Sequence, residues 1–257
     1  MRIKQFLCIT GIHFEKGFVE KYGFVPYTNI HEPLFISGFG RHIYKNLSLI
    51  EKHKSLIVLR WAGGDLMWFL KHPVEMERMR RLKNVFHIAI SHWLADDLKS
   101  VDIPYIFLPV SVYKNDDIKP CPLGDFVYIY KGLDPQYGLE MIRQIHLPDI
   151  TVVSSESVND YSREEILKIY EKCFLGLRLT RHDGIANTVC ELGLMGRKTI
   201  WNGDVPSAIH YNDVEDVRRI IMEEYNNRHN ADYNKVAQDV KNYLDIGEEF
   251  LNTEFYG

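Results

Sequence analysis

The stretch from Cys173 to Gly203 holds the residues whose types and spacing say most about chemistry. It opens with an apolar run that we expect to be a buried strand, which ends in four polar residues: Arg178, Arg181, His182 and Asp183. The chain then turns at Gly184 and is expected to enter a helix at Asn187. Open parallel sheets bind ligands at the carboxyl ends of strands, and a helix N-terminus offers free backbone N–H groups to a phosphate. The stretch therefore predicts an anion site flanked by two arginines, which can make forked contacts to phosphate.

Glu191 lies about one turn inside the expected helix, where its carboxylate can accept hydrogen bonds from ribose hydroxyls. A purely structural alternative exists for the same residues. Thr188 and Glu191 have the spacing of a capping box, in which the two side chains satisfy helix-end donors, and Asp183-Gly184 is an ordinary turn dipeptide. The local cluster of arginine, histidine, aspartate and asparagine carries more polarity than a cap requires, so we favour the anion site.

A second glycine-containing turn lies in the first half of the sequence. Gly38 and Gly40 follow an apolar run and precede an expected helix, so the backbone there can approach a phosphate. The third glycine of a dinucleotide fingerprint is missing, and Arg60 stands where an acidic residue is expected. These two departures disfavour an NAD(P) enzyme.

The segment VLRWAGGDLMW contains a candidate general base. Asp65 follows Gly64 at the end of an expected strand, and there it can take a proton from an acceptor hydroxyl. The alternative is a turn aspartate that caps the chain after it. Trp61 flanks this loop as a candidate platform for a sugar or base, and His92 is a further candidate for contacting the hydroxyl compound. The structural alternatives are that Trp61 is a core residue and that His92 is a surface residue.

Short apolar runs alternate with amphipathic stretches along the chain, which is the pattern of an α/β protein with parallel sheets. In the first half we expect strands at 6–10, 34–37, 56–60, 85–90 and 103–109, and helices near 42–53, 73–82 and 93–100. In the second half we expect strands at 126–130, 150–154, 173–180 and 198–202, and helices at 139–145, 162–172, 187–195, 213–227 and 232–250.

Charges, two prolines and a glycine interrupt the periodicity between the two halves, which predicts a linker at 113–124. We therefore expect a first α/β domain at 1–112 and a second at 125–257. The last helix, 232–250, is a candidate to pack back on the first domain.

Composition excludes several classes of protein. The 257 residues include 31 Lys and Arg against 35 Asp and Glu, so the chain lacks the global basic field of typical nucleic-acid binders. Its four cysteines form no C-x-x-C pair and its histidines no H-E-x-x-H motif, so we expect no metal site and no disulfide framework. No run approaches the roughly 20 apolar residues of a membrane span, and the short apolar stretch near the start is unlike a signal peptide. We expect a cytoplasmic protein.

The stretch 162–203 resembles the signature of retaining, family-4 glycosyltransferases of the GT-B fold. In that signature an acidic residue, seven intervening residues and a glutamate follow a strand and loop; Asp183 and Glu191 occupy the two acidic positions here. The downstream segment ELGLMGRKTIWNG is similar to the family's E-A-x-A-x-G-x-P-V-I, with Lys198 where proline is common. The segment 126–142 is more weakly similar: Lys131 matches the first diphosphate-binding cation, and Tyr137 stands where the second, a lysine, is expected.

The resemblance implies a GT-B architecture with two Rossmann-like domains facing a central cleft. It implies that the second domain binds a nucleoside-diphosphate sugar as co-substrate, with no other cofactor and no metal. It places Asp183 near the sugar, the backbone from Ala186 to Thr188 on the diphosphate, and Glu191 on ribose. His182 and Gly184 then lie in the donor site, and Arg178 or Arg181 supplies the second cation.

The acceptor is a hydroxyl compound of unspecified class: a glycan, a lipid-linked or small molecule, or a modified DNA base. Three other functions stay open on the residues: a sugar-nucleotide epimerase, a non-catalytic nucleotide-sugar-binding module, and a viral-type DNA-base glycosyltransferase. The stereochemical outcome also stays open, because the resemblance suggests retention whereas Asp65 as a base would suit inversion.

Overall fold

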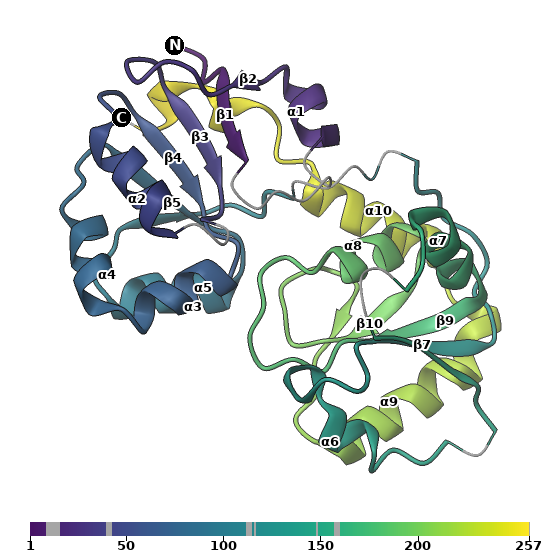
Figure 1. Ribbon diagram of the computed structural model, residues 1–257. Coiled ribbons are helices and arrows are strands. Elements are labelled where there is room, and N and C mark those ends of the chain that lie inside the picture. The colour runs from purple at the N-terminus through teal and green to yellow at the C-terminus, as the bar shows by residue number, and fades with distance from the viewer. Residues whose placement is uncertain are drawn as a thin grey trace. The chain divides into compact units, whose positions relative to one another are not determined.

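The computed structural model describes residues 1–8, 16–39, 43–111, 115, 117–147, 149–156 and 160–256. The chain divides into two compact units. Unit 1 comprises residues 1–114, 182–185 and 244–257, and unit 2 comprises residues 115–181 and 186–243. Each unit is built on one parallel sheet with helices around it, so the α/β class and the parallel sheets predicted from the sequence are confirmed (Figure 1).

The sheet of unit 1 has six strands in the order β2-β1-β3-β4-β5-β6, all parallel. They are β1 (Gln5–Cys8), β2 (Val25–Pro26), β3 (Leu34–Ser37), β4 (Ile57–Arg60), β5 (Val85–Ala89) and β6 (Tyr105–Phe107). The helices are α1 (Lys16–Tyr22), α2 (Ile43–Lys52), α3 (Gly64–Leu70), α4 (Pro73–Arg80) and α5 (His92–Ser100). Every residue of β3 and β4 is buried, because helices or the C-terminal segment cover both faces of a parallel sheet.

Two helices of unit 1 are absent from the sequence prediction. α1 and α3 have seven residues each, about two turns, which is too short for a clear period of 3.6 to emerge. α3 begins directly after Gly63, whose φ of 105° lies in the left-handed region that glycine tolerates. The G-G-D sequence that marked a turn is therefore also the start of a helix.

Unit 2 contains a five-stranded parallel sheet in the order β11-β10-β9-β7-β8. The strands are β7 (Phe126–Tyr130), β8 (Val152–Ser155), β9 (Cys173–Leu177), β10 (Lys198–Ile200) and β11 (Ala208–Ile209). The helices are α6 (Leu139–Ile142), α7 (Arg163–Lys172), α8 (Asn187–Leu194), α9 (Val214–Asn227) and α10 (Tyr233–Leu244). Within this unit α7, α8 and α10 lie on one face of the sheet, and α6 and α9 lie on the other (Figure 1).

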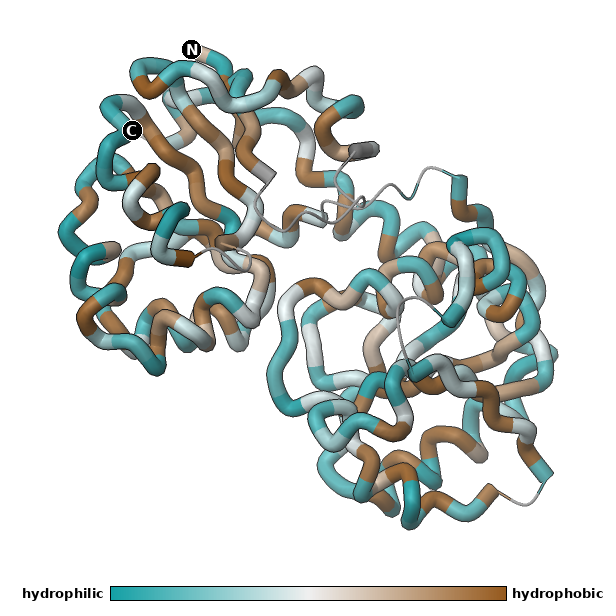
Figure 2. The backbone as a smooth tube through the Cα atoms, in the orientation of Figure 1, coloured by the Kyte–Doolittle hydropathy of each residue, from teal (hydrophilic) through white to brown (hydrophobic). Residues whose placement is uncertain are grey.

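The apolar core of each unit follows its strands. Brown, apolar segments run through the centre of both sheets, and the hydrophilic stretches lie on the outer helices and loops (Figure 2). In unit 2 one core cluster packs α9 against the sheet through Val217 and Ile221, and a second packs Leu192 of α8 against Tyr128. Both faces of the sheet are thus covered, as a doubly wound sheet requires.

The C-terminal segment returns to unit 1. The last long helix ends at Leu244 rather than at the expected Phe250, and Gly247, with φ 67°, follows in the loop. Phe250 is 1% exposed and packs its ring against Tyr22 and Phe35. Residues 115 and 117–124, which the sequence assigns to a linker, belong to unit 2.

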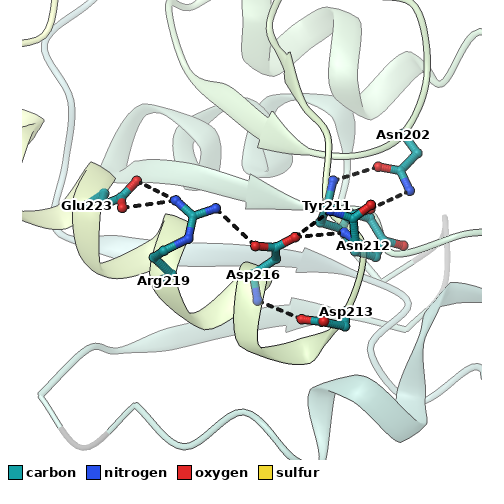
Figure 3. A network of polar contacts seen from close by, with 7 residues as sticks. All are labelled: Asn202, Tyr211, Asn212, Asp213, Asp216, Arg219 and Glu223. Carbon is teal, nitrogen blue, oxygen red and sulfur yellow. Dashed lines mark hydrogen bonds and ion pairs between the residues drawn. The ribbon is translucent and has the colours of Figure 1, made fainter.

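A polar network fixes the chain between β11 and α9 (Figure 3). Asn202 receives a hydrogen bond from the backbone N–H of Tyr211 and donates one to its carbonyl. The Asp213 side chain accepts from the N–H of Asp216 at 2.9 Å and so caps α9. Asp216 in turn binds Asn212 and Arg219.

The cap gives a first testable prediction. We expect Asp213→Ala to lower the free energy of unfolding by about 1 kcal/mol, because a donor at the start of α9 loses its acceptor. Asp213→Asn keeps the acceptor and serves as the control, with a loss of less than about half that. Denaturant titration measures both; equal losses in the two variants would show that the cap is not what stabilises this helix.

No helix among the described residues combines the length and the apolar character needed to cross a membrane.

Candidate functional site

The sheet of unit 2 reverses its strand order between β7 and β9. From β7 the chain goes outward to β8 on one side and then returns to β9 on the other. In open α/β sheets, ligands bind outside the carboxyl ends of the strands at such a switch point. Lys131 comes directly after β7 and Arg178 directly after β9, so two cations that the sequence singled out flank this point.

Two tyrosines bring these cations together. The guanidinium carbon of Arg178 lies 4.6 Å from the ring centre of Tyr130 and 5.0 Å from that of Tyr137. Lys131 Nζ lies 5.3 Å from the Tyr137 ring centre and 3.9 Å from a carboxylate oxygen of Asp134. Tyr137 therefore lies close to both cations, and an aromatic ring beside Arg178 replaces the lysine that the resemblance would place there.

A close backbone contact holds Tyr137 in this position. Gly138, the next residue, has φ 85° and links a short 3-10 turn, η2 (Pro135–Tyr137), to α6. A Cβ at Gly138 would lie 2.5 Å from the Cβ of Leu179, so no side chain fits there. Leu179 is the residue after Arg178, which ties the turn carrying Tyr137 to the end of β9.

α8 begins at the same edge of the sheet, because it follows β9 and leads into the parallel strand β10. Its N-cap is Ala186, and no side chain caps its first turn. The capping box considered for Thr188 and Glu191 is therefore wrong. The N-cap residue therefore provides no side-chain acceptor to the first turn, and an anion can take that place at a helix N-terminus.

Glu191 is 3% exposed and forms an ion pair with Arg163, the first residue of α7. Arg163 also lies 3.4 Å from a carboxylate oxygen of Asp117, and the side chain of Asn187 hydrogen-bonds Glu191. Burial raises the pKa of the Glu191 carboxyl, and the charge and hydrogen bond of Arg163 oppose that rise. The carboxylate expected to bind ribose is thus held by an arginine 28 residues away.

A chain of buried hydroxyls runs from the end of β8 to α8. Tyr128 shares a hydrogen bond with Ser155 and another with Tyr170, and Tyr170 hydrogen-bonds Thr188. Burial raises the pKa of Tyr128 to about 12, so the phenol stays neutral and can donate. These bonds, rather than a capping box, satisfy Thr188.

The Arg163 pair gives a second testable prediction. Arg163→Met leaves a buried carboxylate without its cation, and we expect a loss of about 2 kcal/mol in the free energy of unfolding at pH 8. Without Arg163 the native pKa of Glu191 rises further above its unfolded value. Native-state stability linked to the proton on Glu191 is then present at low pH and is lost as the pH rises through that native pKa.

The measurement is therefore denaturant unfolding at pH 5 and pH 8, where the loss relative to wild type grows with pH. Arg163→Met combined with Glu191→Gln removes the buried charge as well. This double variant should recover most of the stability, and its loss relative to wild type should no longer grow with pH. A loss that is equal at both pH values would contradict a role through Glu191.

In unit 1 the structure favours the capping alternative for Asp65. The residue is 9% exposed, and its carboxylate accepts hydrogen bonds from the backbone N–H groups of Phe39, Ala62 and Leu66. Burial raises its pKa while these three donors oppose the rise. Asp65 therefore ties the loop after β3 to the loop after β4.

Trp61 is a core residue and not a platform for a ligand. It is 0% exposed, its ring stacks on Phe39 at 5.7 Å, and its indole N–H donates to Nδ1 of His87. Burial lowers the pKa of His87 to about 4, so this histidine is neutral and can accept that bond. The stacking role considered for Trp61 is corrected accordingly.

The segment 182–185 belongs to unit 1. His182 Nε2 lies 2.8 Å from a carboxylate oxygen of Asp97 in α5, and the Ser91 hydroxyl donates to the carbonyl of Asp183 at 2.8 Å. The Asp183 carboxylate accepts from the N–H of Gly184 at 2.9 Å. Ser91 also caps α5 by accepting a hydrogen bond from the N–H of Leu94.

The remaining predicted residues lie apart from these contacts. Gly38 is buried with φ 67° at the end of β3, Gly64 is exposed at the start of α3, and Gly40 is outside the described residues. His92 is half-buried beside Trp93, with ring centres 4.2 Å apart. Arg181 is exposed.

Sequence reasoning missed Arg163 and Asp97, which bind two of the predicted residues. Their partners are 28 and 85 residues distant, and neither pair has a local spacing that would reveal it. The contact of Tyr130 with Arg178 was also missed. The sequence offers only a weak sign of it, an aromatic residue directly before Lys131 at the end of a strand. Within the described part of the chain, no group of three or more His, Cys, Asp or Glu side chains is placed to hold a metal ion.

The sequence matches no protein-family model and no curated protein. Solved structures do resemble the fold. Sucrose-phosphate synthase from Thermosynechococcus elongatus superposes with a TM-score of 0.54 at 10% identity, over 93% of this chain and 73% of that one. TarM superposes with a TM-score of 0.63 at 11% identity, over 93% of this chain and 56% of TarM. A variant of S. aureus TarM in complex with Fondaparinux, alpha-GlcNAc-glycerol and UDP gives 0.58 at 11% identity, over 86% and 53%.

This chain spans little more than half the length of the TarM structures. At identities of 10% and 11% the likeness concerns the fold alone. The chain thus has the α/β fold of the GT-B glycosyltransferases, with two Rossmann-like units that are each built on a parallel sheet.

Proposed function

We propose that this protein transfers a sugar from a nucleoside-diphosphate sugar to a hydroxyl acceptor without the help of a metal ion. The observation that carries the proposal is the pair of cations at the switch point of unit 2, Lys131 and Arg178, held by Tyr137. A bound diphosphate needs positive charge around it, and these two cations supply that charge at the edge where α/β sheets bind ligands. The UDP bound in the TarM complex makes a nucleoside diphosphate a reasonable first probe.

Each group of unit 2 has a role in this proposal. Lys131 and Arg178 neutralise the diphosphate, and the uncapped first turn of α8 adds backbone N–H donors and the positive end of its dipole. Together they stabilise the charge that develops on the leaving diphosphate. Glu191 accepts from the ribose hydroxyls once it exchanges bonds with Arg163 or shares them. The sequence resemblance assigns the sugar hydroxyls to Asp183, which belongs to unit 1.

The hydrogen bonds of Asp65 favour one competing function, a non-catalytic nucleotide-sugar-binding module. Because its carboxylate is committed to three backbone N–H groups, it is a positioning residue for the loops of unit 1 and not a ready general base. A non-catalytic nucleotide-sugar-binding module would need no base at all. Retaining transfer likewise needs no Asp65 base, so we keep transfer as the main proposal.

The test is a transfer assay with the purified chain. UDP-, GDP-, ADP- and dTDP-sugars are incubated with glycan, lipid-linked, small-molecule and hydroxymethylated-DNA acceptors, with and without EDTA. We expect one nucleoside diphosphate to be released, only when a suitable acceptor is present, and equally in EDTA. Donor epimerised without acceptor would point to an epimerase, and donor bound but never consumed would point to the non-catalytic module. Either outcome overturns transfer.

A further inference from the structure

Unit 1 contains a cavity of about 760 Å³ at the amino ends of β5 and β6. This is the opposite edge of the sheet from the loops that carry Gly38, Asp65 and Ser91. Three segments line it: the end of α4 with the turn into β5 (residues 77–87), the chain entering β6 (102–106), and the C-terminal turn η5 (Thr253–Tyr256) through its last two residues. Its volume lies within the roughly 300–1,000 Å³ typical of small-molecule sites.

Part of the cavity lining is cationic. Arg80, Arg81 and Lys83 line it, against the two carboxylates of Glu77 and Asp102, so the charged lining is net positive by one. Glu77 pairs with both arginines, at 3.2 Å and 3.0 Å, which holds the guanidinium groups side by side. Lys83 makes no ion pair with the residues that the structure describes. An anion is the complementary ligand for this part of the lining.

Another part of the lining is aromatic. Phe255 is 41% exposed and lines the cavity together with Tyr105. Tyr256 is 4% exposed, packs against the Phe86 ring at 5.4 Å, and donates its hydroxyl proton to the carbonyl of Phe250. The wall is therefore anchored to the core and offers flat rings on which another ring can stack.

We propose that this cavity binds an organic phosphate carried on a ring, with the phosphate at Arg81 and Lys83 and the ring against Phe255 and Tyr105. The ring can belong to a nucleotide or to a phosphorylated sugar, which share this chemistry. The site is separate from the switch point of unit 2, and it does not depend on the proposed transfer reaction.

The probes are AMP, glucose 6-phosphate and inorganic phosphate, titrated by calorimetry into the full chain. Hydrogen exchange measured by mass spectrometry locates the bound probe, because a nucleotide can also occupy unit 2. We expect AMP or glucose 6-phosphate to bind at least tenfold more tightly than inorganic phosphate and to protect residues 80–86 and 253–256. AMP alone would identify the nucleotide as the source, and glucose 6-phosphate alone the phosphorylated sugar.

Three variants complete the test. Arg81→Gln with Lys83→Gln should weaken this binding at least tenfold, and Phe255→Ala several-fold. Arg143→Gln is the matched control, because Arg143 is an exposed arginine in a similar local ion pair with Glu140, and it should bind as wild type does. The proposal is overturned if neither ring phosphate protects these residues, if inorganic phosphate binds equally well, or if the cavity variants bind like the control.

Discussion

Replacing Arg197 by leucine is expected to lower the free energy of unfolding of unit 2 by about 4 kcal/mol. Arg197 is 0% exposed, and no acidic side chain among the described residues pairs with it. Its guanidinium donates instead to six backbone carbonyls, those of Cys121, Pro122, Tyr170, Glu171, Cys173 and Met195. Several of these carbonyls would be left buried without a donor.

The position of Arg197 explains why so many carbonyls meet there. Tyr170 and Glu171 lie in the last turn of α7, and Met195 is the C-cap of α8, so the arginine lies at the negative ends of two helix dipoles. It also binds the chain at Cys121 and Pro122 to this junction. One side chain thus joins two helices and the segment that leads into β7.

Denaturant unfolding followed by circular dichroism measures the effect. Arg197→Lys keeps the charge but loses the planar set of five donors, so we expect an intermediate loss. Arg143→Leu, at a 64% exposed arginine, is the control and should change stability by no more than about 0.5 kcal/mol. A loss below about 1 kcal/mol for Arg197→Leu would show that water or rearranged backbone replaces the arginine.

The second large effect concerns the cations of unit 2. Lys131→Gln together with Arg178→Gln is expected to weaken binding of a nucleoside diphosphate at least a hundredfold. Hydrogen bonds to charged groups contribute about 1.5–3 kcal/mol each, and two of them are lost. Arg178 contributes the larger share, because it is 7% exposed and its guanidinium is oriented by Tyr130 and Tyr137.

The controls separate charge from folding. Arg181→Gln tests the other arginine of the same stretch, which is exposed, and we expect a loss of less than about threefold. Each variant is first checked for cooperative unfolding. Equal losses of affinity for Arg178→Gln and Arg181→Gln would mean that contact with the tyrosines does not determine which arginine binds the diphosphate.

The sequence predicts nine of the eleven strands among the described residues, because their signals are local. It misses β2 and β11, which have only two residues each. The strand at 126–130 agrees with β7 residue for residue, since an apolar run is bounded by Asp125 and Lys131. The last helix is shorter than expected, because its apolar spacing continues past Leu244 although the chain leaves the helix before Gly247. Phe250 keeps its helical spacing but packs into the core of unit 1. Apolar periodicity indicates which residues are buried, but not whether they lie in a helix or in another segment that packs on the core.

The site shows the same division between local and distant signals. Arg178 can be found from the sequence because it lies at the end of an expected strand, and Lys131 is found through the family resemblance. Parallel strands share one carboxyl edge, which brings the two residues to the same edge of the sheet. The partners of Glu191 and Thr188 cannot, because Arg163 and Tyr170 come from another helix and satisfy groups that the local spacing assigned to each other. Tertiary contacts decide whether such a side chain bonds a local or a distant partner, and a sequence motif alone does not show the distant one.

The most direct test of the central claim is equilibrium binding of nucleoside diphosphates and their sugars to the whole chain. A panel of UDP, GDP, ADP and dTDP with matching sugars is screened by thermal shift, because a ligand that binds only the folded state raises its stability. Calorimetry then compares wild type with the Lys131→Gln, Arg178→Gln double variant. We expect one diphosphate class to stabilise the wild type and the double variant to lose this binding. A folded wild type that binds no member of the panel, or a double variant that binds as well as wild type, would contradict the central claim.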